Sequence, residues 1–257
     1  MTDIKTSKEA VKNFAEAWDQ EVRSLWPESY PNELSNMLKD YGVKTILDCA
    51  GGTGYPSIEL KQMGWDITYS DGSSVMLGIF TEKLEATQLG IPKYHSRWEE
   101  LSQKVPDTYD ALMCIGNSFI GINSYESVFA ISDETVKANM LSAVSEFYKK
   151  LNNGGILYID LMNANSSAPD QPYSQVLTTE TDHIFTTISY DPVTNIRTNF
   201  KSKTSLIDGS VTDAVTKLVP LFTEELINLL LEAGFSRVER STVDDADYVD
   251  SFFAFKD

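Results

Sequence analysis

Residues 46–54 hold the clearest candidate for chemistry, because a short apolar run breaks there into a glycine-rich turn, Ile-Leu-Asp-Cys-Ala-Gly-Gly-Thr-Gly. The run predicts a buried strand, and the spacing of apolar residues after the turn predicts a helix. Glycine has no Cβ, so a ligand can approach the backbone closely, and unpaired amides at a helix start favour a polar or anionic group. We therefore expect a small-molecule site at this turn.

Asp71 is the second candidate, since it ends the next strand-like run. A carboxylate about 20 residues beyond a glycine turn, at the end of the following strand, is where an open α/β sheet places an acceptor for ribose hydroxyls. Asp71 could instead cap the helix that begins near Ser74. Its distance from the glycine turn favours the ribose role.

Asn117 follows the apolar run Tyr109–Ile115, which predicts a place at the carboxyl edge of a parallel sheet, where ligands bind in such folds. We interpret it as a candidate for a substrate hydrogen bond, with a turn residue as the alternative. The two histidines are weaker candidates for a general base. His95 ends a predicted strand, which favours a structural role, and His183 lies in an alternating segment, where a surface position is favoured over reach into a pocket.

The balance of charges limits the classes of partner. The 257 residues carry 38 acidic and 21 basic side chains, a net charge of −17, which repels nucleic acid and anionic membrane surfaces. A neutral or cationic small molecule is compatible with this charge, although acidic side chains also serve solubility. Cys49 and Cys114 lie inside apolar runs, so we expect neither a disulfide framework nor a metal site.

No run approaches the roughly 20 apolar residues that a membrane span requires. The first residues also lack the charged-then-apolar pattern of a secretory signal. We therefore expect a soluble, cytoplasmic protein.

Alternating strand and helix patterns position these candidates. Helices are predicted over residues 7–22, 31–41, 58–63, 75–89, 134–151 and 223–234. Seven strands are predicted, one from Lys44 to the glycine turn and the others at about 66–70, 92–95, 109–115, 156–161, 235–242 and 249–255. Strand and helix alternate over the first 160 residues, which predicts an α/β fold with a doubly wound, mostly parallel sheet.

The pattern changes near Asn163. Residues from about 175 to 219 alternate with period two around turns at 191–192 and 208–209, which predicts an antiparallel meander. We interpret the chain as one domain in four parts: an N-terminal helical lid (about 1–42), a core (about 43–162), an antiparallel β insertion (about 163–220) and a closing helix with strands (about 221–257).

Residues 47–54 resemble motif I of the class I S-adenosylmethionine-dependent methyltransferases, and the spacing to Asp71 matches the acidic residue after the second strand in that family. Residues 109–119, Tyr-Asp-Ala-Leu-Met-Cys-Ile-Gly-Asn-Ser-Phe, are similar to the fourth-strand segment of glycine N-methyltransferases. The resemblance covers about residues 40–163. It implies a Rossmann-like fold, S-adenosylmethionine as the cofactor and S-adenosylhomocysteine as its product.

The resemblance also implies the residues of the cofactor site. Gly52 and Gly54 would line the turn under the methionine part, with Ala50 where the family has its first glycine. Asp71 would hold the ribose hydroxyls and Trp98 would lie beside the adenine, with core packing as the alternative for this ring. The full set of predicted cofactor-binding positions is Asp48, Ala50, Gly51, Gly52, Gly54, Asp71, Gly72, Ser73, Arg97, Trp98, Cys114, Ile115 and Gly116.

Two positions depart from the family pattern. Met162 stands where the glycine-methylating enzymes carry an arginine for the substrate carboxylate, and a thioether cannot make that bidentate contact, which argues against glycine or sarcosine as substrate. Trp26 replaces an arginine aimed at the cofactor carboxylate, and Arg23 is a nearby candidate to take its place. The predicted substrate-binding positions are Asn117, Ser118, Met162 and Asn163, with Asn117 as the catalytic candidate.

Methyl transfer from a sulfonium is an in-line displacement of an activated leaving group, so it mainly requires orientation and a dry pocket. A neutral amine or ring nitrogen attacks directly, whereas a hydroxyl needs a base within hydrogen-bond reach. The scarcity of an obvious base favours N-methylation of a small neutral or cationic amine or heterocycle. O-methylation of a phenol or carboxylate and non-catalytic cofactor binding stay open, and so does a homo-oligomer.

Overall fold

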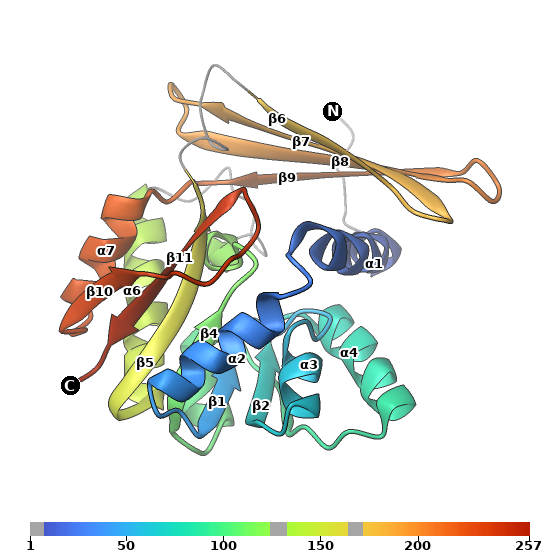
Figure 1. Ribbon diagram of the computed structural model, residues 1–257. Coiled ribbons are helices and arrows are strands. Elements are labelled where there is room, and N and C mark those ends of the chain that lie inside the picture. The colour runs from blue at the N-terminus through green and yellow to red at the C-terminus, as the bar shows by residue number, and fades with distance from the viewer. Residues whose placement is uncertain (1–7, 124–132, 164–171) are drawn as a thin grey trace.

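The computed structural model describes residues 8–123, 133–163 and 172–257. Two sheets make up its β-structure: a central one with helices on both faces, and a second that lies across one end of the first (Figure 1). The site described below lies between the two sheets.

The central sheet has seven strands in the order β10-β11-β5-β4-β1-β2-β3. Strands β1 to β5 pair in parallel, whereas β11 is antiparallel to both β5 and β10. The chain order reverses between β1 and β4, and open α/β sheets bind ligands at such a point. The predicted doubly wound fold is confirmed. The strands are β1 (Thr45–Asp48), β2 (Asp66–Asp71), β3 (Lys93–His95), β4 (Tyr109–Cys114), β5 (Leu151–Met162), β10 (Arg237–Arg240) and β11 (Val249–Phe255).

The position of strand β4 between two core clusters explains why its sequence is almost continuously apolar. Leu112 and Cys114 pack into a core cluster on the face covered by α5, α6 and α7, while Ala111 and Met113 pack into the cluster on the face covered by α2, α3 and α4. A strand buried on both faces needs apolar residues at every position. The helices are α1 (Lys8–Leu25), α2 (Tyr30–Asp40), α3 (Ser57–Gln62), α4 (Ser74–Thr87), α5 (Leu101–Lys104), α6 (Asp133–Lys150) and α7 (Thr223–Glu232).

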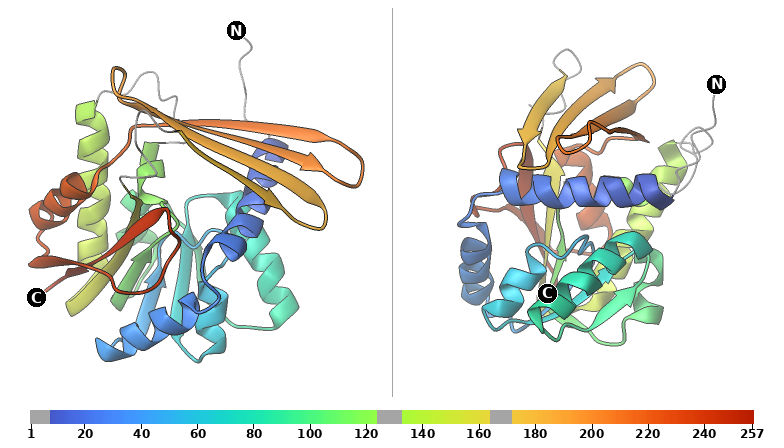
Figure 2. Two further views of the ribbon diagram at one scale, coloured as in Figure 1. Left: turned by 45° about the horizontal axis from the view of Figure 1, so that its top comes forward. Right: turned by 90° about the vertical axis from the view of Figure 1, so that its right-hand side faces the viewer.

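The second sheet is the predicted antiparallel meander, with its four strands paired in chain order. It consists of β6 (Tyr173–Thr178), β7 (Asp182–Asp191), β8 (Ile196–Ser205) and β9 (Val211–Leu218). Figure 2 shows α1 running beneath this sheet and above α4. The meander and α1 therefore cover the end of the central sheet at which β1, β2 and β4 finish.

Some details differ from the sequence-based expectation. The segment at residues 152–155 ends α6 as predicted, but it forms an irregular first part of β5, with Gly154 at a φ of +76° and a register shift in the pairing with β4. Short 3₁₀ helices occur at Trp98–Glu100 and Phe119–Asn123, and α5 is a single turn; none of these has the length to show a helical period in the sequence. Within the described ranges, no helix is long and apolar enough to cross a membrane.

Candidate active site

Close packing requires the glycines of the turn after β1. A Cβ on Gly51 would lie 2.2 Å from the ring of Tyr69, and one on Gly54 would lie 2.6 Å from the ring of Phe80. These two rings are stacked with centroids 3.9 Å apart, so neither can move away easily. Gly54 also has a φ of +104°, which side-chain-bearing residues rarely adopt. The turn is therefore held against a rigid aromatic pair.

Asp48 fixes the turn from beneath. Its carboxylate accepts hydrogen bonds from the Ala50 amide at 3.2 Å and from Ser57 Oγ at 2.5 Å. Burial raises the pKa of Asp48 to about 7 in spite of these two donors. The side chain is fully buried and does not line the cavity described below. Asp48, predicted to bind the cofactor, thus contacts the turn itself.

Asp71 joins the end of β2 to the glycine turn. Its Oδ2 accepts from the Gly52 amide at 2.8 Å and its Oδ1 accepts from the Ser73 amide at 2.7 Å. Burial raises the pKa of Asp71, while these two amides act in the opposite direction. The cap of α4 is Ser73, whose Oγ accepts from the Met76 amide at 3.4 Å, so Asp71 is not the side chain that caps this helix. Each carboxylate oxygen keeps a lone pair for a ligand hydroxyl.

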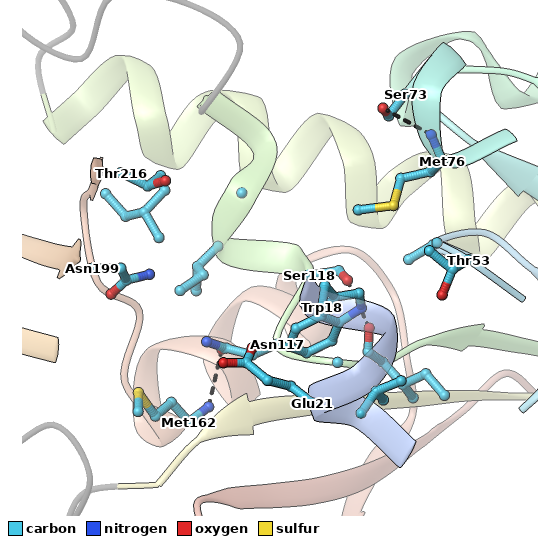
Figure 3. A pocket seen from close by; sticks show the side chains of 18 of the residues that line it. Trp18, Glu21, Thr53, Ser73, Met76, Asn117, Ser118, Met162, Asn199 and Thr216 are labelled. Carbon is cyan, nitrogen blue, oxygen red and sulfur yellow. Dashed lines mark hydrogen bonds between the residues drawn. The ribbon is translucent and has the colours of Figure 1, made fainter. Parts of the chain in front are cut away.

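A cavity of about 560 Å³ opens between the turn, the ends of β2 and β4, helix α1 and the four-stranded sheet (Figure 3). Most of the predicted site positions line it: Ala50, Gly51, Gly52, Asp71, Gly72, Ser73, Arg97, Trp98, Ile115, Gly116, Asn117, Ser118 and Met162. Residues separated by more than a hundred positions in the chain are thus brought to one space.

Four predicted positions lie outside the cavity lining: Asp48, Gly54, Cys114 and Asn163. Gly54 packs against Phe80, and the thiol of Cys114 is buried in the core cluster. Asn163 donates its side-chain amide to the carbonyl of Asp247 at 2.7 Å. These residues therefore lie outside the lining of the cavity.

Trp98 belongs both to the core and to the cavity lining, and its place beside the adenine stays a prediction. Its ring packs in the core with its centroid 5.7 Å from those of Phe119 and Phe147, and it also lines the cavity. Its Nε1 donates to the carbonyl of Cys49 at 2.6 Å, which fixes the ring beside the end of β1. The neighbouring Arg97 forms an ion pair with Glu99 at 2.9 Å.

The turn after β4 is held by Asp160, a buried carboxylate near the end of β5. The Gly116 and Asn117 amides donate to its two oxygens at 2.7 and 2.6 Å. Asn117 has a φ of +54°, and its Oδ1 accepts from the Met162 amide at 3.1 Å, which leaves the Nδ2 group to serve as a donor elsewhere. Burial raises the pKa of Asp160 to about 7. Asn117 is therefore both a turn residue and a part of the cavity wall.

Helix α1 contributes residues that sequence reasoning missed. Thr53 Oγ1 donates to Asp19 at 2.6 Å, which ties the helix to the glycine turn. A Cβ on Gly116 would lie 3.0 Å from the ring of Trp18, so this ring closes over the turn after β4. Glu21 also lines the cavity and is only 5% exposed. The sequence carried one signal that could have identified Glu21: it lies about one helical turn after Trp18, on the apolar face of the helix.

Arg23 does not take the place of the missing family arginine. Its guanidinium forms an ion pair with Glu59 at 2.9 Å and lies over the ring of Tyr55 at 5.5 Å, and Arg23 does not line the cavity. Trp26, which stands at the family position, is buried and lines the cavity. The prediction that Arg23 replaces the family arginine is therefore wrong, because Arg23 lies outside the cavity.

Neither histidine lines the cavity. His95 Nε2 donates to the carbonyl of Gly72 at 3.0 Å, and His183 bonds to Thr178 Oγ1 at 2.9 Å on the exposed meander. In the part of the chain that the structure describes, no three or more His, Cys, Asp or Glu side chains are grouped so as to hold a metal ion. The polar groups of the cavity are therefore carboxylates, hydroxyls, amides and one lysine, Lys201, besides Arg97.

The chain is similar in sequence to named methyltransferases, although no family model matches it. It is 31% identical over 156 residues to a glycine/sarcosine N-methyltransferase of Aphanothece halophytica, an alignment covering 60% of this chain and 54% of that relative. It is 25% identical over 252 residues to the same-named enzyme of Halorhodospira halochloris, covering 94% of this chain and 86% of the relative. The chain spans about half the length of the first of these relatives.

Solved structures share the fold. An S-adenosylmethionine-dependent methyltransferase from Clostridium acetobutylicum superposes with a TM-score of 0.73 at 12% identity, covering 96% of this chain and 98% of that one. The S-adenosylmethionine-bound amino pentose methyltransferase CalS10 from Micromonospora echinaspora superposes with a TM-score of 0.65 at 13% identity over the full length of both chains. In sequence this chain is similar to glycine/sarcosine N-methyltransferases, and its fold is the one found in class I S-adenosylmethionine-dependent methyltransferases.

Proposed function

We propose that the protein transfers a methyl group from S-adenosylmethionine to a nitrogen atom of a small molecule. The observation that carries the proposal is the bond of 2.8 Å between the Gly52 amide and Asp71, which joins the glycine turn and the ribose-binding carboxylate at one end of the cavity. The relatives are named N-methyltransferases, and CalS10 holds S-adenosylmethionine in the same fold, which supports the cofactor.

The residues at this end of the cavity fit the cofactor. Gly52 in the turn after β1 has no atom beyond its chain neighbours closer than 3.8 Å to the place where a Cβ would lie, so its backbone is open to the methionine chain. Asp71 has carboxylate lone pairs for two ribose hydroxyls, and the ring of Trp98 offers an apolar surface for adenine. When bound, the cofactor supplies a methyl group on a positively charged sulfur, a leaving group that needs no further activation.

The protein then has to orient the acceptor and exclude water. Trp18 and the four-stranded sheet wall off the cavity, and we assign α1 and the meander the role of its lid. Asn117 lies at the carboxyl end of β4 and is the candidate to orient the acceptor through its side-chain amide. A nitrogen acceptor is favoured because a neutral amine attacks without a base and because the relatives are named N-methyltransferases.

Met162 argues that the acceptor differs from that of the relatives. It is 5% exposed, lines the cavity and presents a thioether where an arginine would bind a carboxylate. We therefore propose a neutral or cationic amine or a heterocycle, in preference to glycine or sarcosine.

The test is a transfer assay with S-adenosylmethionine that carries a deuterated methyl group. The protein is incubated with panels of amines, phenols and carboxylic acids, and mass spectrometry locates the label. Label on nitrogen is the expected result. Label on oxygen alone would replace the proposal by O-methylation, and binding of S-adenosylhomocysteine without transfer to any panel would make the protein a non-catalytic binder.

A further inference from the structure

The cavity has aromatic walls where α1, the four-stranded sheet and Tyr248 line it. We call this part the acceptor half; it is lined by Trp18, Glu21, Tyr173, Asn199, Lys201 and Tyr248. Trp26 bridges the rings, with its centroid 6.1 Å from Trp18 and 5.6 Å from Tyr248, and Tyr173 lies 6.2 Å from Tyr248. Aromatic faces carry negative charge density, and they attract cations placed within about 6 Å of the ring centre.

Glu21 supplies a carboxylate to the same walls. Its Oε1 accepts from Thr186 Oγ1 at 2.7 Å, and its Oε2 accepts from Lys201 Nζ. Two lone pairs on the carboxylate remain after these bonds. The cationic head of Lys201 is already engaged, because it bonds to Glu21 and lies 5.9 Å from the centre of the Trp18 ring. Lys201 therefore contributes less to ligand binding than its charge suggests.

Two further oxygen atoms in the acceptor half face no donor. Asn199 Oδ1 and the hydroxyl of Tyr248 are buried without a hydrogen-bond partner within the described ranges. These two atoms have almost no accessible surface, so they lie behind the cavity wall, where their negative partial charges favour a cation in the cavity.

Nearby carboxylates act on the two tyrosines of the acceptor half. Burial is the main cause that raises the pKa of Tyr248, and the charges of Asp160, Glu21 and Asp245 raise it further. The pKa of Tyr173 is raised in the same way by burial, with added contributions from Glu21 and Asp247. Negative charge next to a phenol disfavours its anionic form and favours a cation nearby.

We infer that the acceptor half binds a basic amine in its cationic form, with the nitrogen between the Glu21 carboxylate and the aromatic rings of Trp18, Tyr173 and Tyr248. An ammonium nitrogen has no lone pair, so one N–H bond breaks and its proton leaves to solvent before the neutral nitrogen accepts the methyl group. The inference rests on the proposed function and deepens it by naming the substrate class. It also makes Glu21 the residue that determines specificity for nitrogen over oxygen acceptors. A nitrogen gains positive charge as it is methylated, so groups that stabilise a cation here act on the transition state as well.

The experiment uses three probes of similar size and different charge on the protein saturated with S-adenosylhomocysteine. Tetramethylammonium carries a positive charge, tert-butanol is neutral and trimethylacetate is negative. Titration calorimetry at constant ionic strength gives the affinity of each. We expect tetramethylammonium to bind about tenfold more tightly than tert-butanol, because a partly desolvated cation is attracted to an aromatic site. We expect trimethylacetate to bind most weakly.

Variants of the ion pair give a sign test. Glu21→Gln leaves the positive charge of Lys201 unbalanced. We therefore expect this variant to bind tetramethylammonium about tenfold more weakly and trimethylacetate more tightly. Lys201→Met leaves Glu21 unbalanced, so it is expected to have the opposite effect on both probes. Glu28→Gln is the matched control, because Glu28 is exposed and does not line the cavity.

The affinity for S-adenosylhomocysteine separates this inference from the proposed function. If S-adenosylhomocysteine does not bind to the unmodified protein, the proposed function fails. If it binds equally well to the unmodified protein and both variants, those proteins have folded sites, and the probe affinities decide. Equal affinities for the three probes, or tighter binding of trimethylacetate by the unmodified protein, would overturn the inference and point to Lys201 as a carboxylate-binding group.

Discussion

The Gly52 amide donates a hydrogen bond of 2.8 Å to Asp71 Oδ2, so the turn after β1 and the end of β2 form one unit. The carboxylate that we propose to bind ribose hydroxyls therefore also holds the backbone of the glycine turn. We expect Asp71→Ala to weaken S-adenosylhomocysteine binding about 10- to 100-fold, since it removes charge-assisted hydrogen bonds. Titration calorimetry measures the effect, with Asp66→Ala at the exposed start of β2 as the control. An unchanged affinity would contradict the ribose role.

Gly51 is predicted to tolerate no side chain. Gly51→Ala places a Cβ 2.2 Å from the Tyr69 ring, which is itself stacked on Phe80, so the free energy of unfolding should fall by about 2–3 kcal/mol. Gly78→Ala is the contrasting change: Gly78 lies within α4 with open space around it, and alanine there should stabilise by about 0.5–1 kcal/mol. Urea denaturation compares the two. Equal stabilities would show that the turn yields to the added methyl group.

Trp98 allows packing and adenine contact to be separated. Trp98→Phe keeps an aromatic surface but loses the Nε1 bond to Cys49, so we expect a loss of about 1 kcal/mol in unfolding free energy with affinity for S-adenosylhomocysteine nearly retained. Trp98→Ala should lower both. The two variants are compared by denaturation and calorimetry. Retained affinity in the alanine variant would assign Trp98 to the core alone.

Met162→Arg should not create glycine methylation. An introduced arginine binds a carboxylate only in a pocket that suits one, and here the cation Lys201 of the cavity is already paired with Glu21. The assay is methylation of glycine with the unmodified protein and the variant, followed by mass spectrometry. Robust glycine turnover by the unmodified protein would show that Met162 does not exclude this substrate.

The pH dependence of stability should report on Asp160. Burial raises its pKa to about 7 in the folded protein, from about 4 in an unfolded chain. Between these values the folded state keeps a proton that the unfolded state releases, so its contribution to stability falls as pH rises towards 7 and is constant above. Unfolding free energies at pH 5 and pH 8 should therefore differ less in Asp160→Asn than in the unmodified protein, by on the order of 2 kcal/mol. Equal differences in the two proteins would contradict the assignment.

Local spacing was sufficient to predict most of the residues that line the cavity beside the glycine turn, the half proposed to hold the cofactor. The glycine turn, Asp71 and the Gly116–Asn117 turn each follow a strand of a parallel sheet, and the carboxyl ends of such strands meet at one edge. The sequence therefore predicted both the fold and most residues that line this half. It could not show that Asp48 and Cys114 point away from the cavity, because strands buried on both faces lack the alternation that would tell one face from the other.

The acceptor half depends on contacts between distant segments. Glu21 pairs with Lys201 across 180 positions of the chain, and each alone has an ordinary explanation as a charged residue of a helix or of an alternating strand. Only the meander lying over α1 brings them together. Asp160 was visible as the acid that follows an apolar strand, but its bonds to the two amides after β4 depend on the pairing of β4 with β5.

Calorimetric titration of the unmodified protein with S-adenosylmethionine and S-adenosylhomocysteine tests the central claim most directly. The account predicts saturable binding of both ligands at one site, weakened by Asp71→Ala and unaffected by Asp66→Ala. Absence of binding at millimolar ligand would contradict it.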